Sequence, residues 1–216
     1  MATVSFTQMK QGTKEDYQLL HQYEAPFHSK TAQRLIAELK RQGQDSLDGY
    51  PISRLEHSLQ SATRAWRDNA NDDWIVAALL HDIGDGLAPQ NHDRVAAEII
   101  RPFVSEEVTW VIEHHGAFQM IYYAHHLDGW NPNERDKCRY HVYYQSAVDF
   151  CERWDQNSFD PHYENQTLAF FEPFLERVFA RKAYAPQTIK AGIMSGLPPA
   201  SATAGQTVTT KQEQGE

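Results

Sequence analysis

The strongest constraint in this sequence is a run of seven apolar residues, 74–80 (WIVAALL), that leads directly into His81 and Asp82. A membrane span takes roughly 20 apolar residues, so this short run indicates a helix buried in a protein core. A charged carboxylate at its end costs free energy unless it is paired or binds a metal. The alternative is that Asp82, Gly84 and Gly86 simply end the helix, and the two interpretations are equally open at this point.

Helical patterns continue along the chain, and strand patterns are scarce. Ser53 and Glu56 have the spacing of a capping box, and Leu35, Ile36 and Leu39 recur on one face of a helix. Periodic apolar segments of this kind are typical of helical bundles, so we expect an all-α fold. The expected helices cover residues 13–27, 30–42, 53–68, 72–86, 92–103, 105–116, 141–156 and 168–181.

Composition limits the class of protein. The chain has 216 residues, of which 41% are hydrophobic and 12% aromatic, so it is long and apolar enough to bury a core. We assign residues 1–182 to one domain with a helical N-terminal extension. Residues 183–216 are rich in Ala, Gly, Pro, Ser and Thr, and we expect them to form a flexible tail.

Charge and cysteine content bear on partners and compartment. The 20 Lys and Arg against 29 Asp and Glu give a net charge of −9, which argues against broad binding to nucleic acid or to anionic membranes. Cys138 and Cys151 lie 13 residues apart and form no CxxC pair, and the N-terminus lacks the pattern of a secretory signal. We therefore expect a cytoplasmic protein.

Further histidines and a carboxylate accompany the pair that follows the apolar run. His57 lies one turn into an expected helix, and His92 opens another. His115 ends a third helix, and Asp155 follows a fourth. Four imidazoles and two carboxylates suit a pair of borderline transition metals, such as iron, better than magnesium or calcium alone. Helical bundles build dinuclear sites from side chains on different helices, and Asp82 can then bridge the two metals.

These residues stand in segments that resemble the HD-domain superfamily. LEHSLQ carries His57, LLHDIGD carries His81 and Asp82, and RWD carries Asp155; these are the four ligand positions common to the superfamily. The resemblance covers about residues 50–156. It implies an HD-domain helical bundle with a metal site in its core.

The two remaining histidines resemble a subset of the superfamily with dinuclear sites. This subset includes HD phosphohydrolases and the mixed-valent diiron oxygenases, namely myo-inositol oxygenase and the phosphonate-cleaving HD oxygenases. NHDRVAAEII, with His92, and IEHH, with His115, are most similar to the phosphonate-cleaving enzymes. The adjacent His114 points about 100° away on a helix and is the alternative to His115, which the register with the family favours. The resemblance thus implies two metals held by His57, His81, Asp82, His92, His115 and Asp155.

The substrate site matches that family less well. Asp85 stands where the phosphonate-cleaving enzymes have a histidine, and Gln119 stands where they have a lysine. Both of those cations help to hold a phosphonate, and an acid and an amide fit a dianion poorly. Gln60 matches a substrate-contacting glutamine of the family, and Tyr50 resembles an upstream tyrosine at a different spacing. We expect substrate contacts from Tyr50, Gln60, Asp85 and Gln119, and catalytic roles for Asp82 and Asp85.

Several other residues have weaker claims. His125 and His126 are expected to be structural or to support the ligands, and His141 and His162 to lie on the surface. Tyr122 and Tyr123 are expected to pack at a helix end, with lining of the pocket as the alternative. Cys151 is expected in the core.

Three functions follow from these observations. We favour a diiron oxygenase with an Fe²⁺/Fe³⁺ pair that uses O₂ to cleave a small hydroxylated substrate, organophosphonate-like or another polar alcohol. The alternative is a phosphohydrolase with Mn²⁺, Zn²⁺ or Mg²⁺ that acts on a phosphate ester or nucleotide. No Lys/Arg cluster for a phosphate is evident near the ligands, which counts against the hydrolase. A non-catalytic binding module is the third possibility, and the intact ligand set argues against it.

Overall fold

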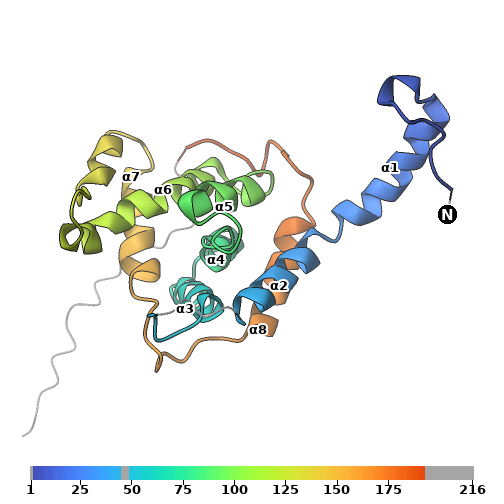
Figure 1. Ribbon diagram of the computed structural model, residues 1–216. Helices are drawn as coiled ribbons and strands as arrows, with labels where there is room; N and C mark the ends of the chain where they lie inside the picture. Colours follow the sequence, from blue (N-terminus) through green and yellow to red (C-terminus); the bar gives the residue numbers. More distant parts are fainter. Residues whose placement is uncertain (1, 45–48, 193–216) are drawn as a thin grey trace, which may run out of the picture.

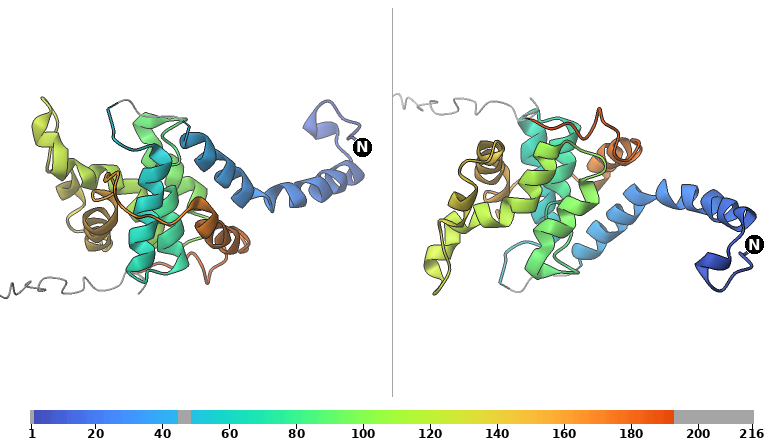
Figure 2. Two further views of the ribbon diagram at one scale, coloured as in Figure 1. Left: turned by 90° about the horizontal axis from the view of Figure 1, so that it is seen from below. Right: turned by 90° about the horizontal axis from the view of Figure 1, so that it is seen from above.

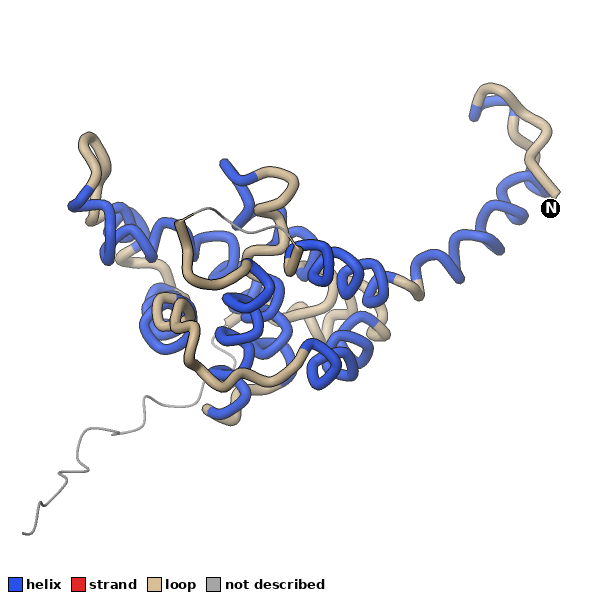
Figure 3. The backbone as a smooth tube through the Cα atoms, turned by 60° about the horizontal axis from the view of Figure 1, so that its bottom comes forward, coloured by secondary structure: helices blue, strands red, loops and turns tan. Residues whose placement is uncertain are grey.

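The computed structural model describes residues 2–44 and 49–192, and every regular element in these ranges is helical (Figures 1 and 3). The predicted all-α fold is confirmed. None of the helices described is both long and apolar enough to cross a membrane. The α-helices are α1 (Lys14–His28), α2 (Thr31–Gln42), α3 (Arg54–Arg67), α4 (Asp72–Leu80), α5 (His92–Ile100), α6 (Glu106–Tyr123), α7 (Tyr144–Phe150) and α8 (Leu168–Phe179). Short helical turns lie at Met9–Gln11, Pro89–Asn91, Ala124–His126, Glu134–Cys138 and Cys151–Asp155.

The apolar helix α4 lies at the centre of the body, and α3, α6 and α8 pack around it (Figure 1). Every residue from Trp74 to Leu80 is at most 3% exposed. A helix that is apolar on all sides is stable in water only when it is covered on all sides, as α4 is here. His81 and Asp82 therefore follow directly from the most buried element of the fold.

The start of α3 is formed as the sequence predicts. The Glu56 amide donates to Ser53 Oγ at 3.2 Å, and the Ser53 amide donates to Glu56 Oε2 at 2.7 Å. This capping box fixes the first turn of the helix that carries His57. The predicted apolar face of α2 is also buried, at Ala32, Leu35, Ile36 and Leu39.

Two helix ends differ from the prediction. α4 ends at Leu80, before Gly84 and Gly86, and a series of tight turns follows. α6 does not end at Gly116 but continues to Tyr123. A glycine typically ends a helix by adopting a positive φ, and none of these three glycines does so. Gly84 serves close packing instead, because a Cβ there would meet the backbone of His92.

The later helices also have different bounds. The helix expected over residues 141–156 is divided, because α7 spans only Tyr144–Phe150 and a π turn follows it. α8 begins at Leu168 as expected, capped by Thr167 Oγ1 and with Pro173 inside it, but it ends at Phe179 and not at residue 181. Cys151 is buried in the core, as predicted.

The two ends of the described chain behave differently. α1 extends away from the body in both Figure 1 and Figure 2, and Asp16 is its one buried residue. Residues 183–192 of the predicted tail lie along the body, where Tyr184 N–H donates to Pro102 O at 2.8 Å and Glu106 N–H donates to Lys190 O at 3.2 Å. The rest of the predicted tail, residues 193–216, lies outside the described residues.

We expect Leu175→Ala to lower the free energy of unfolding by roughly 2–5 kcal/mol, because it removes a fully buried side chain from α8, which packs on α4. Urea unfolding of metal-free protein measures the loss. The matched control is Leu127→Ala, at an exposed leucine, which is expected to change this free energy by no more than about 0.5 kcal/mol. Equal losses in the two variants would contradict the central position of α4.

Candidate metal centre

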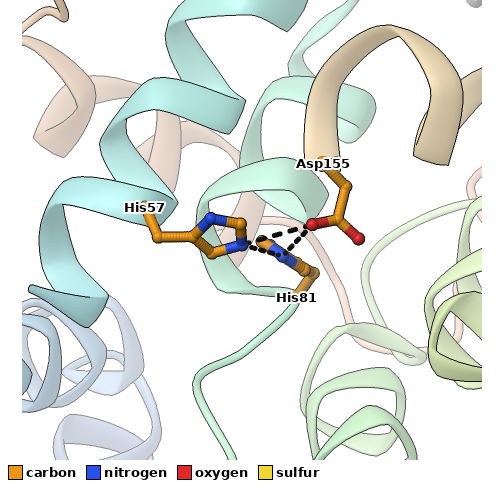
Figure 4. Close-up of side chains that lie close together, drawn as sticks. All are labelled: His57, His81 and Asp155. Carbon is orange, nitrogen blue, oxygen red and sulfur yellow. Dashed lines mark hydrogen bonds and ion pairs between the residues drawn. The ribbon is translucent and has the colours of Figure 1, made fainter. Parts of the chain in front are cut away.

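Six residues from separate parts of the fold come together beside the end of α4. Figure 4 shows three of them, with two histidine rings and one carboxylate turned toward a common point. They are the six residues that the sequence predicts as metal ligands. The residues are His57 on α3, His81 and Asp82 in the turns after α4, His92 at the start of α5, His115 on α6 and Asp155 at the end of the π turn.

The first set of ligand atoms, here called the inner group, comprises His57, His81 and Asp155, all at most 5% exposed. The two Nε2 atoms lie 3.0 Å apart, and Asp155 Oδ1 lies 3.2 Å from His57 Nε2 and 3.3 Å from His81 Nε2. Ligand atoms about 2.1 Å from one metal ion and at right angles to each other are separated by about 3 Å. The inner group therefore has the spacing of ligands that share one ion.

Asp82 connects the inner group to a second set, the outer group of His92 and His115. Asp82 Oδ2 lies 3.5 Å from His57 Nε2 and 3.6 Å from His81 Nε2. Asp82 Oδ1 lies 3.3 Å from the Nε2 atoms of both outer histidines. One carboxylate thus presents one oxygen to each group, which is the arrangement that a ligand bridging two ions requires.

The tautomer of each histidine is set by a backbone carbonyl. A ring whose Nδ1 donates a hydrogen bond carries a lone pair on Nε2, and this is how histidine ligands are usually oriented. In all four rings Nδ1 has such a partner, so the four Nε2 lone pairs face the centre. The acceptors are Ser158 O for His57 (2.8 Å), Ala78 O for His81 (2.8 Å), Pro89 O for His92 (3.1 Å) and Ile112 O for His115 (2.7 Å).

This donor set fits a metal better than it fits a hydrogen-bond network. Two Nε2 lone pairs 3.0 Å apart, on His57 and His81, cannot bond to each other while both Nδ1 atoms carry the protons. Asp155 Oδ2 is buried and has no hydrogen-bond partner among the described residues. Nitrogen and carboxylate oxygen together suit iron, manganese or zinc.

Electrostatics favour a cation at the same place. Burial opposes a charge on His57, but its hydrogen bond with Asp155 and the charge of Asp82 raise the pKa of His57 above its usual value. The pKa of Asp82 is held well below its usual value; burial works against this, and the charge of His81 and the hydrogen bond with His115 outweigh burial. The carboxylates therefore attract positive charge, either protons or a metal.

Local backbone features bring two ligands into place. Asp155 ends the π turn Cys151–Asp155, a wider turn of the kind often found at functional sites. Gly84 lies so close to α5 that a Cβ would meet His92 O at 2.7 Å. This glycine thus allows the turns after α4 to approach the start of α5, where His92 lies.

Two adjoining cavities open onto the ligands. The first has a volume of about 270 Å³ and is lined by Arg54 and Asp85, among others. The second has a volume of about 400 Å³ and is lined by Gln119, Tyr122 and Tyr123, among others. Both have room for a small molecule. The residues that line both cavities are Tyr50, His57, Asp82, His92 and Phe159.

Three of the four predicted substrate contacts, Tyr50, Asp85 and Gln119, line these cavities. Gln60 is placed differently. It is 2% exposed, its Nε2 donates to Asp160 O at 2.8 Å, and its Oε1 accepts from Asp160 N–H at 3.3 Å. In the structure, Gln60 therefore holds the segment after the π turn and stands outside the residues that line either cavity.

Arg54 and Phe159 are among the cavity residues that were not predicted from the sequence. Arg54 forms an ion pair with Asp85, and its signal is its spacing, since it precedes His57 by one turn on the same face of α3. The ring of Phe159 stacks on His57, with centroids 4.5 Å apart, and on Tyr50 at 5.6 Å. Phe159 lies in a loop with no motif, so nothing in the sequence marks it.

The other histidines lie away from the ligands. His114 Nδ1 donates to Trp110 O at 2.8 Å, and its ring stacks on Trp110, as does the ring of His141. His125 and His126 were expected to be structural or to support the ligands, but both are exposed in the turn after α6. His162 is exposed, as predicted. Tyr122 and Tyr123, expected to pack, line the second cavity.

We expect His115→Ala to lose bound metal, because its Nε2 faces Asp82, and His114→Ala to keep it, because its ring stacks on Trp110. Metal content per chain after purification and dialysis measures both. Since the two positions are adjacent on one helix, each variant controls for disturbance of α6 by the other. The reverse result would move the ligand to His114.

We also expect metal binding to release protons. The pKa values of His57, His81 and His115 are raised above the ordinary value of about 6.5, because the nearby carboxylates outweigh burial, so the metal-free rings hold protons at higher pH than a free histidine does. A metal needs them deprotonated, so its affinity falls as pH is lowered through the raised pKa values. Zn²⁺ titration calorimetry in two buffers of different ionisation heat counts the protons. An affinity independent of pH from 6 to 8 would contradict this expectation.

Comparison with known proteins shows what the part of the chain around this site is similar to. The family model described as HD domain matches residues 54–147, which include five of the six ligands. A [1-hydroxy-2-(trimethylamino)ethyl]phosphonate dioxygenase (glycine-betaine-forming) of Leisingera caerulea is 32% identical over 88 residues, 36% of this chain and 45% of that protein. A hydroxymethylphosphonate dioxygenase of Gimesia maris is 33% identical over 86 residues, 34% of this chain and 43% of that protein.

The aligned part of the chain thus spans less than half the length of either relative. The similarity is confined to part of each protein, and the family match falls on the part that carries the predicted metal ligands from α3 to α6. Residues 54–147 therefore match an HD domain, and the chain is distantly homologous to the HD-domain phosphonate dioxygenases.

Proposed function

We propose that this protein is a mixed-valent diiron oxygenase that uses O₂ to cleave a small hydroxylated substrate, organophosphonate-like or another polar alcohol. The observation that carries the proposal is Asp82, which offers one oxygen to the inner group and one to the outer group. The activities named for the two relatives support it, since both are dioxygenases of hydroxylated phosphonates.

We assign different roles to the inner and outer groups. The side chains of His57 and His81 are 7% and 0% exposed, whereas the side chain of His92 is 24% exposed. We therefore assign substrate binding to the outer group and a supporting role to the inner group. A bound iron pair would supply the redox chemistry and would polarise the substrate hydroxyl.

The cavity walls orient the substrate and limit access of water. Phe159 and Tyr50 stack above His57, so apolar rings cover one side of the ligands. Excluding water strengthens polar contacts to the substrate and protects reactive species. Iron(II) is best kept in a reducing compartment, so the proposal retains the cytoplasmic localisation predicted from the sequence.

A metal-dependent phosphohydrolase is the second candidate, and one observation favours it. Arg54 supplies a cation in the first cavity, which the sequence analysis did not find near the ligands. An arginine beside two metals suits a phosphate ester as well as it suits a phosphonate. In this case Mn²⁺, Zn²⁺ or Mg²⁺ would lower the pKa of a bound water.

The test is a comparison of metals and products on one preparation. We expect anaerobically purified protein to hold about two irons per chain, with a mixed-valent EPR signal after partial oxidation. Hydroxymethylphosphonate should change that signal and cause O₂ uptake. His92→Ala should abolish uptake, and His162→Ala, at an exposed histidine, should leave it unchanged. Phosphate release from p-nitrophenyl phosphate with Mn²⁺ or Zn²⁺, without O₂ uptake in the iron form, would establish the hydrolase instead.

A further inference from the structure

The first cavity contains an ion pair that the metal ligands do not require. Arg54 is the first residue of α3, and its guanidinium meets the carboxylate of Asp85, in the turns after α4. The two side chains are 19% and 9% exposed. Arg54 precedes His57 by three residues, and Asp85 follows Asp82 by three. Each member of the pair is therefore close in sequence to one of the predicted ligands.

The pair is connected to the outer group. Asp85 Oδ1 lies 3.2 Å from His92 Nδ1, while the other Asp85 oxygen meets Arg54. Arg54, Asp85, Asp82 and His92 all line the 270 Å³ cavity. A molecule whose one end contacts Asp82 and His92 therefore lies in the same space as the guanidinium.

Arg54 is the one lysine or arginine among the described residues that line either cavity. Its guanidinium has five N–H donors, and Asp85 is the single acceptor that the described residues give it. Arg177 provides a contrast, because it lies on the surface and places both Nε and Nη2 on Asp72. The guanidinium of Arg54 thus keeps donors for an acceptor that the cavity itself does not supply.

A purely structural role explains the pair less well. Taking an arginine and a carboxylate out of water costs free energy that their attraction recovers only when the remaining donors are also satisfied. Here they are not. The fork of an arginine matches a carboxylate, phosphate or phosphonate in two-point contact, so an anion would complete the arrangement.

We propose that Arg54 binds the anionic group of the substrate and that Asp85 is the positioning residue that holds the guanidinium in the cavity. The substrate is then an anionic hydroxy compound, with its hydroxyl at Asp82 and His92 and its phosphonate or carboxylate group at Arg54. The position of the hydroxyl rests on the proposed function. The anion contact does not, and it would serve a phosphate ester equally.

Binding to Zn²⁺-loaded full-length protein tests this without turnover. The probes are hydroxymethylphosphonate, glycolate and its neutral analogue glycolamide, and the variants are Arg54→Gln, Arg54→Lys and the surface control Arg177→Gln. We expect Arg54→Gln to weaken both anions roughly 10- to 100-fold, to leave glycolamide unchanged and to keep its metal. Arg54→Lys should recover part of the loss, and Arg177→Gln should behave as wild type.

The role of Asp85 is tested through Arg54. If Asp85 acts by positioning the guanidinium, Asp85→Asn changes the glycolate affinity in the wild-type background and has no effect in the Arg54→Gln background. An equal effect in both backgrounds would show that Asp85 acts independently.

Three results would overturn the anion contact. They are wild-type protein that binds neither anion, Arg54→Gln protein that binds them unchanged, and Arg54→Gln protein that loses metal. The oxygenase proposal fails separately: anions that bind through Arg54 but cause no O₂ uptake in the iron form would leave the anion site in place and remove the oxygenase.

Discussion

The hydrogen bonds from histidine Nδ1 atoms to backbone carbonyls are the interaction on which the rest of the site depends. They fix each ring so that its Nε2 lone pair faces Asp82. For His81 and His115 the carbonyl lies one turn earlier, so the bond forms with the local backbone. For His57 the partner is Ser158, 101 residues away, so the first ligand is oriented only when the segment after α7 packs against α3.

The segment after the π turn, residues 158–160, is accordingly fixed by several contacts. Gln60 clamps Asp160 through both backbone groups, and Ser158 Oγ donates to Trp154 O at 2.6 Å. Phe159, between them, stacks on His57. The loop therefore orients a ligand, covers it and closes a cavity wall at once. In the structure Gln60 acts on the site through the backbone of this loop.

The sequence predicts best those structural features that depend on residues close together in the chain. The capping box of Ser53, the burial of the apolar run and the all-α class all follow from local patterns. The path of the turns after α4 does not, since Gly84 lies against the backbone of His92, and this contact is not visible in the sequence. The convergence of six ligands and the bridging role of Asp82 were inferred from residue types and a resemblance. Which histidines lie near each oxygen of Asp82 is seen only in the structure.

The charge of the first cavity cannot be inferred from Asp85 alone. Asp85 alone suggests a site that has exchanged a cation for an acid and so rejects anions. Its ion pair with Arg54 reverses that conclusion, because the acid holds a guanidinium that the sequence places 31 residues earlier. Either proposed reaction can use such a cation, so the cavity charge does not separate oxygenase from hydrolase. The predicted ligands narrow the choice of metal. Four imidazoles disfavour Mg²⁺, which prefers oxygen, so iron, manganese or zinc would determine the chemistry.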